Sequence, residues 1–171
     1  YWIWCGSVVQ GEDGAYHMFA SRWPKDLGFG ANWLFNCEIV RASSKNPEGP
    51  YTFQEVVLGR RGRTFFDGLN VHNPYIRKWN QTYYLYYMGT TFGGPIPGPG
   101  DEVDSSRFTE VWNRKRIGLA TAPSVFGPWT RCDEPLISPR DCSTWDCTAT
   151  TNPAGAIQPD GTTYMLDKPR S

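Results

Sequence analysis

The stretch that decides the fold is Phe66–Tyr87, which reads FDGLNVHNPYIRKWNQTYYLYY. It combines an acidic residue, an Asn-Pro pair at a six-residue spacing, an apolar strand, a turn and an aromatic strand. The same order recurs at Trp145–Leu166, again with the Asn six residues after the Asp. An internal repeat of this kind indicates a fold assembled from similar units.

Two further strands complete each unit. The strand 38–43 matches the strand 116–121, and each precedes a Gly-Pro-aromatic stretch, Gly49–Tyr51 or Gly127–Trp129. A weaker third copy opens the chain, with an apolar run, the turn Glu12–Gly14 and another aromatic strand. Asp-Gly between two strands is a strong hairpin signal, because the turn requires positive φ. Each unit is therefore expected to consist of about four antiparallel strands.

Sheets of this kind, repeated along a chain, are the blades of a β-propeller, so the predicted fold is all-β. The repeats amount to about two and a half blades over residues 1–171, whereas propellers close with about four to eight. We therefore expect about half of a propeller, a fragment or processed piece whose other blades come from further sequence. A β-sandwich is the alternative, but it does not explain the repeat. The Gly- and Pro-rich segment 90–113 is predicted to be an exposed loop insertion.

Composition excludes several classes of partner. The 17 Lys+Arg balance the 17 Asp+Glu, and no basic block is present, which argues against nucleic acid. No apolar run reaches the ~18 residues that cross a bilayer. Five cysteines without a CxxC motif and only 2 histidines argue against zinc, so no metal or cofactor is predicted.

The cysteines bear on the compartment. A disulfide among Cys132, Cys142 and Cys147 would suit an oxidising environment, and reduced thiols are the alternative. The expected location is extracellular or in the secretory compartment, with the cytoplasm left open.

Taken together, the motifs resemble those of the glycoside hydrolase family 43-like proteins, which are five-bladed propellers of the arabinanase, levansucrase and invertase group. The resemblance covers essentially the whole chain and is carried by Gly11–Pro24, Pro47–Tyr51, Asp67-Gly68, His72–Pro74 and Arg116–Thr121. It implies an active site in the funnel at one end of the central channel, where the inner strands begin. It also implies three carboxylates there: an Asp base, an Asp that tunes pKa and orientation, and a Glu acid.

The chain departs from that carboxylate pattern. Asn73 and Asn152 stand where the resemblance leads us to expect Asp before Pro, and no Glu-Gly-Pro begins an inner strand. In a related agar-oligosaccharide hydrolase family a His serves as the acid, and His72 lies two residues before Pro. We therefore take His72, Asp67 and Asp146 as candidate catalytic residues, with His72 as acid. The alternatives are a buried channel histidine and an Asp that recurs because the fold recurs.

Five further residues are candidates for binding the sugar. Asn73 and Asn152 would bond hydroxyl groups, or else satisfy buried backbone. Arg22 and Trp23 would supply a charged rim and an aromatic platform, although such a Trp more often packs in a core. Arg116 occupies the place of Glu38 in the next unit, so these two could pair between blades.

The sequence thus predicts a glycoside hydrolase that cleaves a glycosidic bond in an oligo- or polysaccharide by acid–base catalysis with water. Its partner would be carbohydrate, and at least one catalytic carboxylate would come from the other blades. The alternative is a non-catalytic carbohydrate-binding or structural propeller that has lost the carboxylates. A sugar transferase or phosphorylase on the same fold is a third possibility. The oligomeric state is not predicted.

Overall fold

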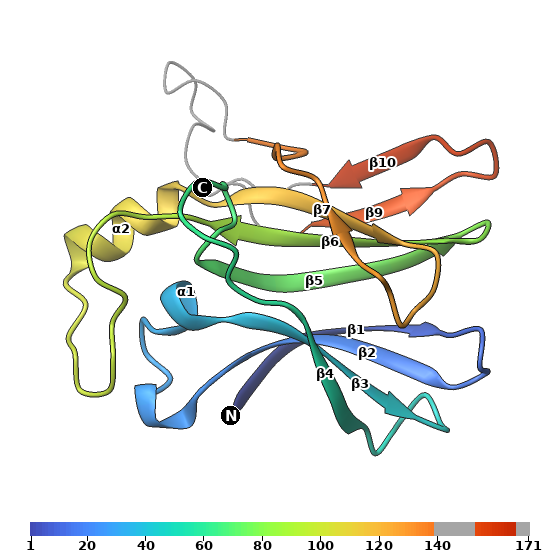
Figure 1. Ribbon diagram of the computed structural model, residues 1–171, viewed down its shortest axis with the longest axis horizontal. Coiled ribbons are helices and arrows are strands. Elements are labelled where there is room, and N and C mark those ends of the chain that lie inside the picture. Colours follow the sequence, from blue (N-terminus) through green and yellow to red (C-terminus); the bar gives the residue numbers. More distant parts are fainter. Residues whose placement is uncertain (139–152, 167–171) are drawn as a thin grey trace.

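The computed structural model describes residues 1–138 and 153–166 and is built mainly of antiparallel sheet (Figure 1). Blade 1 contains, in spatial order, β1 (Trp2–Gln10), β2 (Tyr16–Trp23), β3 (Glu38–Ser44) and β4 (Thr52–Leu58). Blade 2 contains β5 (Asn70–Trp79), β6 (Thr82–Thr90), β7 (Arg116–Ala122) and β8 (Thr130–Arg131). A third sheet consists of β9 (Ala154–Ile157) and β10 (Thr163–Leu166). The predicted four-stranded blades are confirmed.

The two inner strands share an irregularity that identifies them as copies of one another. The β1–β2 register shifts between Trp4 and Ser7, and the β5–β6 register shifts between His72 and Tyr75. Within these shifts Cys5 has a φ of 50° and Asn73 a φ of 51°. Each inner strand therefore bends at a bulge that contains one left-handed residue. The weak opening repeat is accordingly a true structural copy of the Asn-Pro strand.

The core lies between the two blades. Because neighbouring residues of a strand point to opposite faces, β2 directs Phe19 toward blade 2 and Ala20 away from it. The buried apolar cluster that joins the blades comprises Phe19, Ile39, Leu58, Val71, Ile76, Tyr83, Leu85, Tyr87, Ala120 and Val125.

Hydroxyl groups of blade 1 also hold β5 in place. The backbone N–H of Asn73 donates to Ser21 Oγ at 2.8 Å, and that of Ile76 donates to Ser7 Oγ at 3.1 Å. Two backbone donors of β5 are thereby satisfied from the neighbouring blade.

The insertion at 90–113 differs from the exposed loop that its composition predicts. It contains α2 (Ser105–Asn113), which begins where Asp104 accepts a hydrogen bond from the Arg107 N–H at 2.9 Å. Phe92 and Val111 are buried in a cluster with α1 (Trp33–Asn36), so apolar packing stabilises this helix.

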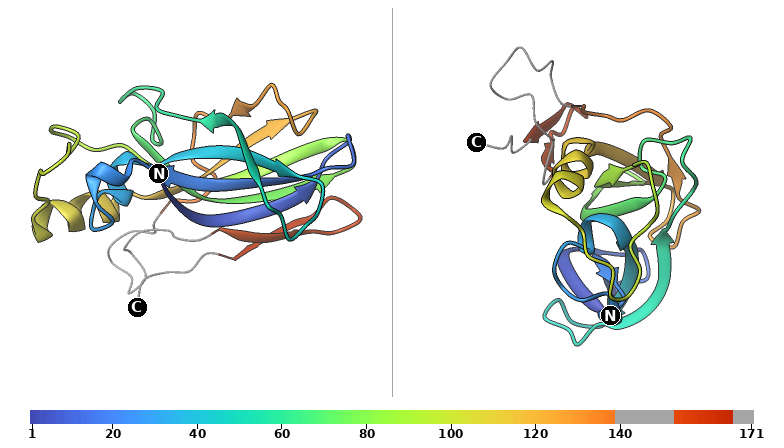
Figure 2. Two further views of the ribbon diagram at one scale, coloured as in Figure 1. Left: turned by 90° about the horizontal axis from the view of Figure 1, so that it is seen from below. Right: turned by 90° about the vertical axis from the view of Figure 1, so that its left-hand side faces the viewer.

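Both helices lie at the same end of the blades, as does the short 3₁₀ helix η1 (Lys25–Leu27) (Figures 1 and 2). Within the described residues, no helix has the length and apolar character needed to span a membrane.

Candidate functional site

The candidate site lies where β5 begins, at the end of the blades that carries α1 and α2 (Figure 1). His72 is 1% exposed there, and the edge of its ring meets Trp33 of α1 at a centroid distance of 5.3 Å. Lys115, also 1% exposed, places Nζ 3.0 Å from the Trp112 ring centroid and 5.9 Å from that of Trp33. We call His72, Trp33, Trp112, Lys115 and Asn70 the His72 cluster.

Asn70 connects His72 to blade 1. Its Oδ1 accepts a hydrogen bond from the Cys37 backbone N–H at 2.6 Å, and its Nδ2 lies 3.0 Å from His72 Nδ1. Burial, with a contribution from the nearby Lys115 charge, lowers the pKa of His72 to about 3. A buried imidazole next to an ammonium resists a second positive charge. The ring is therefore neutral near pH 7, which does not suit the acid role that the sequence suggested for it.

The hydrogen-bond partners of Asp67 are Arg61, Tyr87 and Arg131, none of which belongs to the His72 cluster. Asp67 is fully buried, and its Oδ1 accepts from Arg61 Nε at 2.6 Å. Its Oδ2 accepts from the Tyr87 hydroxyl at 2.7 Å and from Arg131 Nη1 at 3.3 Å. Gly89 makes room for it, because a Cβ there would come within 2.3 Å of Asp67 Cβ. With both oxygens bonded, Asp67 joins the linker between the blades to β6 and β8, which favours the structural alternative.

Asn73 is a residue of the bulge. Its backbone is left-handed and its Nδ2 donates to Met88 Sδ at 3.4 Å. Asn is among the few residues that adopt this conformation readily. The geometry therefore gives Asn73 a backbone role, and its predicted contact with sugar stays a prediction.

Arg22 and Trp23 point to opposite faces of β2, so they do not form one platform. Trp23 is 1% exposed and donates from Nε1 to the Gly28 carbonyl at 3.1 Å, which leaves its ring covered by protein. Arg22 lies on the open face of blade 1, where Nε donates to Glu38 Oε1 at 2.7 Å. Its guanidinium stacks on Tyr1 at 4.1 Å and on Phe53 at 4.4 Å.

The matched positions of Glu38 and Arg116 suggested that these two residues pair between blades, but the structure shows no such pair. Arg116 donates instead to the carbonyl oxygens of Asn113 and Lys115 at 3.2 and 3.0 Å. Glu38 is already engaged by Arg22, which lies directly opposite it in the β2–β3 register.

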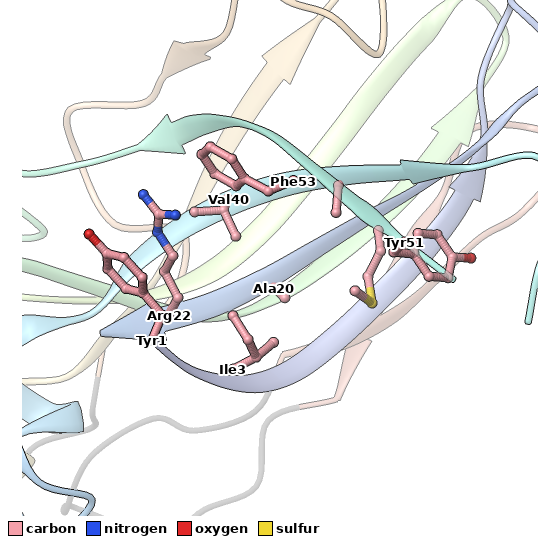
Figure 3. A pocket seen from close by; sticks show the side chains of 9 residues that line it. Tyr1, Ile3, Ala20, Arg22, Val40, Tyr51 and Phe53 are labelled. Carbon is pink, nitrogen blue, oxygen red and sulfur yellow. The ribbon is translucent and has the colours of Figure 1, made fainter. Parts of the chain in front are cut away.

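The open face of blade 1 contains a hollow of about 270 Å³ (Figure 3). Figure 3 shows Arg22 beside Tyr1 and Phe53 at one part of it. The remaining lining is mainly apolar: Ile3, Met18, Ala20, Val40, Ala42 and Tyr51. In blade 2 the β6 residues Leu85 and Tyr87 occupy the places that Met18 and Ala20 have in β2, and both are buried against blade 1. The hollow therefore has the character of a face between blades and lies apart from the His72 cluster.

Two predicted site residues, Asp146 and Asn152, lie outside the described residues, as do Cys142 and Cys147. Cys132 has a free thiol, as do Cys5 and Cys37. Residues 1–138 and 153–166 contain no group of three or more His, Cys, Asp or Glu side chains that could hold a metal ion.

Sequence reasoning missed four members of the His72 cluster: Asn70, Trp33, Trp112 and Lys115. Asn70 could have been predicted from its place two residues before His72 in the same strand, because residues i and i+2 of a strand share a face. Trp33, Trp112 and Lys115 had no such local signal, because they come from the helical insertions of two different blades.

Comparisons with known proteins bear on the fold. No protein-family model and no curated protein sequence matches this chain. Solved structures do match. Zg3597, a family 117 glycoside hydrolase of the marine bacterium Zobellia galactanivorans, is 21% identical with a TM-score of 0.71, over 95% of this chain and 47% of that one.

An exo-1,5-α-L-arabinanase from a bovine ruminal metagenomic library is 18% identical with a TM-score of 0.60, over 95% of this chain and 45% of that one. Arabinanase Arb43A of Bacillus subtilis is 19% identical with a TM-score of 0.60, over 96% and 47%. The chain spans about half the length of these neighbours. The expected family 43-like, five-bladed propeller fold is confirmed, with about half of it present.

Proposed function

We propose that this chain is about half of a glycoside hydrolase propeller and that the complete protein hydrolyses glycosidic bonds in an oligo- or polysaccharide. The observation that carries the proposal is the likeness of nearly the whole chain, at a TM-score of 0.71, to a glycoside hydrolase. The position of the His72 cluster supports it, since the cluster lies where an inner strand begins. That cluster combines aromatic surface with hydrogen-bond donors, the two features that sugar rings and their hydroxyls require.

Hydrolysis needs one group that protonates the leaving oxygen and another that activates water. Asp67 is fully bonded, and within the described residues no carboxylate is bonded to His72. The proposal therefore draws the proton-transfer pair from Asp146 and from blades beyond this chain. The His72 cluster would bind and orient the sugar.

The test is a hydrolysis screen of the complete protein on oligosaccharides that include xylotriose and 1,5-α-L-arabinan fragments. Asp146→Asn should lower kcat at least ~10²-fold, the lower bound for loss of a general acid or base. Asp160→Asn is the matched control, because Asp160 is an exposed turn residue whose Oδ1 accepts from the Thr162 N–H at 2.9 Å. Equal activity of the two variants would exclude Asp146 from the reaction.

A non-catalytic, carbohydrate-binding propeller is the second candidate. It is favoured by one specific observation: the bulge residue before the inner-strand Pro is Asn73, not an acid. Glycan binding by the complete protein, with no turnover of any bound sugar, would establish this function instead.

A further inference from the structure

The feature that carries a further inference is the hydrogen-bond chain from the Cys37 backbone through Asn70 to His72. A backbone N–H can only donate, so the Asn70 atom that lies 2.6 Å from Cys37 N must be its oxygen. The Asn70 amide is thereby oriented without ambiguity, because a rotated amide would place its NH₂ group against another donor.

This orientation decides which nitrogen of His72 carries the proton. Asn70 Nδ2 can only donate, and it lies 3.0 Å from His72 Nδ1. His72 Nδ1 must therefore be the acceptor and carry no proton. A neutral ring in this position holds its one proton on Nε2. Two donors in series, the Cys37 N–H and the Asn70 NH₂, thus lock one tautomer.

Within the part of the chain that the structure describes, the resulting Nε2–H has no hydrogen-bond acceptor. Within the described residues, neither His72 Nε2 nor Thr90 Oγ1 has a hydrogen-bond partner, although both are buried. In the β5–β6 register Asn70 lies opposite Thr90 and His72 lies opposite Met88. Cross-strand neighbours share a face, so the two unsatisfied groups lie on the same face of blade 2. Buried polar groups of this kind are destabilising unless a bound molecule satisfies them.

We propose that the His72 Nε2–H and the Thr90 hydroxyl bind an uncharged oxygen atom, either that of an ordered water or a sugar hydroxyl, and that Asn70 is the positioning residue that fixes this donor. His72 is then a binding residue and not a proton donor in the resting protein. Protonation of Nδ1 would place a second hydrogen between that atom and the Asn70 NH₂ group. The sugar alternative rests on the proposed function, whereas the locked tautomer does not.

The tautomer is tested by ¹⁵N NMR of the protein labelled at histidine. This chain contributes two histidines, His17 and His72. The signals that the His72→Gln variant of the complete protein lacks are those of His72. Near pH 7 we expect one protonated and one unprotonated nitrogen for His72, with the proton on Nε2. A proton on Nδ1, two averaged nitrogen signals, or an imidazolium would overturn the proposal.

The role of Asn70 is tested by Asn70→Asp, which keeps the shape but places a carboxylate oxygen against Nδ1. We expect the His72 proton to move to Nδ1, or the ring to become an imidazolium. The matched control is Asn46→Asp, which makes the same change in an exposed turn and should leave the His72 signals unchanged. An Asn70→Asp spectrum identical to that of the wild type would remove the positioning role. If this variant does not fold, the wild-type spectrum still decides the tautomer.

The bound oxygen is identified through the Nε2–H signal. A cross-peak to water in buffer assigns an ordered water, and a shift on adding xylotriose or arabinotriose assigns a sugar hydroxyl. Thr90→Val should weaken either effect, whereas Thr52→Val, a change in the exposed part of β4, should not. If neither effect is seen, the oxygen site does not exist. Because no arm depends on turnover, an inactive protein would refute the proposed function and leave this test intact.

Discussion

Asp67→Asn is the substitution that most sharply separates a structural from a catalytic carboxylate. Asp67 is fully buried and accepts from Arg61 at 2.6 Å, from Tyr87 at 2.7 Å and from Arg131 at 3.3 Å. The asparagine removes the negative charge and turns one acceptor into a donor that faces other donors. We therefore expect the linker between the blades to lose its bonds to β6 and β8 through Asp67.

The magnitude follows from what the two arginines retain. Removing one partner of a buried ion pair typically costs 3–5 kcal/mol, because the other charge is left uncompensated. Here Arg61 keeps Asp133 at 2.8 Å, and Arg131 Nη2 keeps the Gly59 carbonyl at 2.6 Å. We expect the lower end of that range, about 3 kcal/mol of unfolding free energy, measured by urea denaturation at pH 7.

Asp133→Asn is the matched control, because it removes a carboxylate from the same Arg61. Its side chain is 72% exposed, so the loss should stay below about 1 kcal/mol. If the unfolding free energy of Asp67→Asn lies within about 1 kcal/mol of the wild-type value, a difference typical of surface pairs, Asp67 does not hold the linker in place. Lost hydrolytic activity at unchanged stability would make Asp67 a catalytic residue.

Three further predictions concern stability. Burial lowers the pKa of His72 to about 3, so the unfolded chain binds more protons between pH ~6.5 and that value. Wild-type stability should therefore fall on acidification more steeply than that of His72→Gln, by up to ~1.4 kcal/mol per pH unit, in urea titrations at pH 7 and 5. Burial raises the pKa of Glu12, but hydrogen bonds, chiefly from Ser124, have the larger and opposite effect, so the pKa falls to about 2. The carboxylate then stabilises above pH ~4.5 and loses this effect as the pH falls toward 2, so Glu12→Gln should be destabilised at pH 7 and match the wild type near pH 2 in thermal melts. Ser21→Ala removes the acceptor of the Asn73 N–H at 2.8 Å and should lower the free energy of unfolding by about 1–3 kcal/mol. Equal urea midpoints for the variant and the wild type would contradict this prediction.

Local patterns were sufficient to predict the blades. The turn Glu12–Gly14 joins β1 to β2 as its Asp-Gly signal indicates, and Asn73-Pro74 marks the bulge of β5. The matching bulge of β1, at Cys5, has no Asn-Pro pair. Helix α2 was missed because the Gly- and Pro-rich residues before it dominate the composition of the segment. Its own signals are local, an Asp104 cap followed by apolar side chains at helical spacing.

The site was harder to predict, because its bonds connect distant parts of the chain. Asp67 is bonded to Arg131, 64 residues away, and Asn70 to Cys37, 33 residues away. Spacing along the sequence shows that a carboxylate recurs, but it does not show whether two arginines already bind it. Pairing by matched position failed for the same reason, since Glu38 pairs with Arg22 from its own blade and not with Arg116.

The bulge separates what the fold demands at the start of an inner strand from what chemistry demands there. The fold requires a left-handed residue, and Cys5 and Asn73 both adopt that conformation with different side chains. Asp and Asn tolerate it about equally well, so the backbone would accept an acid at position 73 as readily as an amide. The amide at this position is therefore not imposed by the backbone. In the function proposed above, His72 at the start of β5 would offer a hydrogen-bond donor to an oxygen, and proton transfer would come from carboxylates other than Asp67.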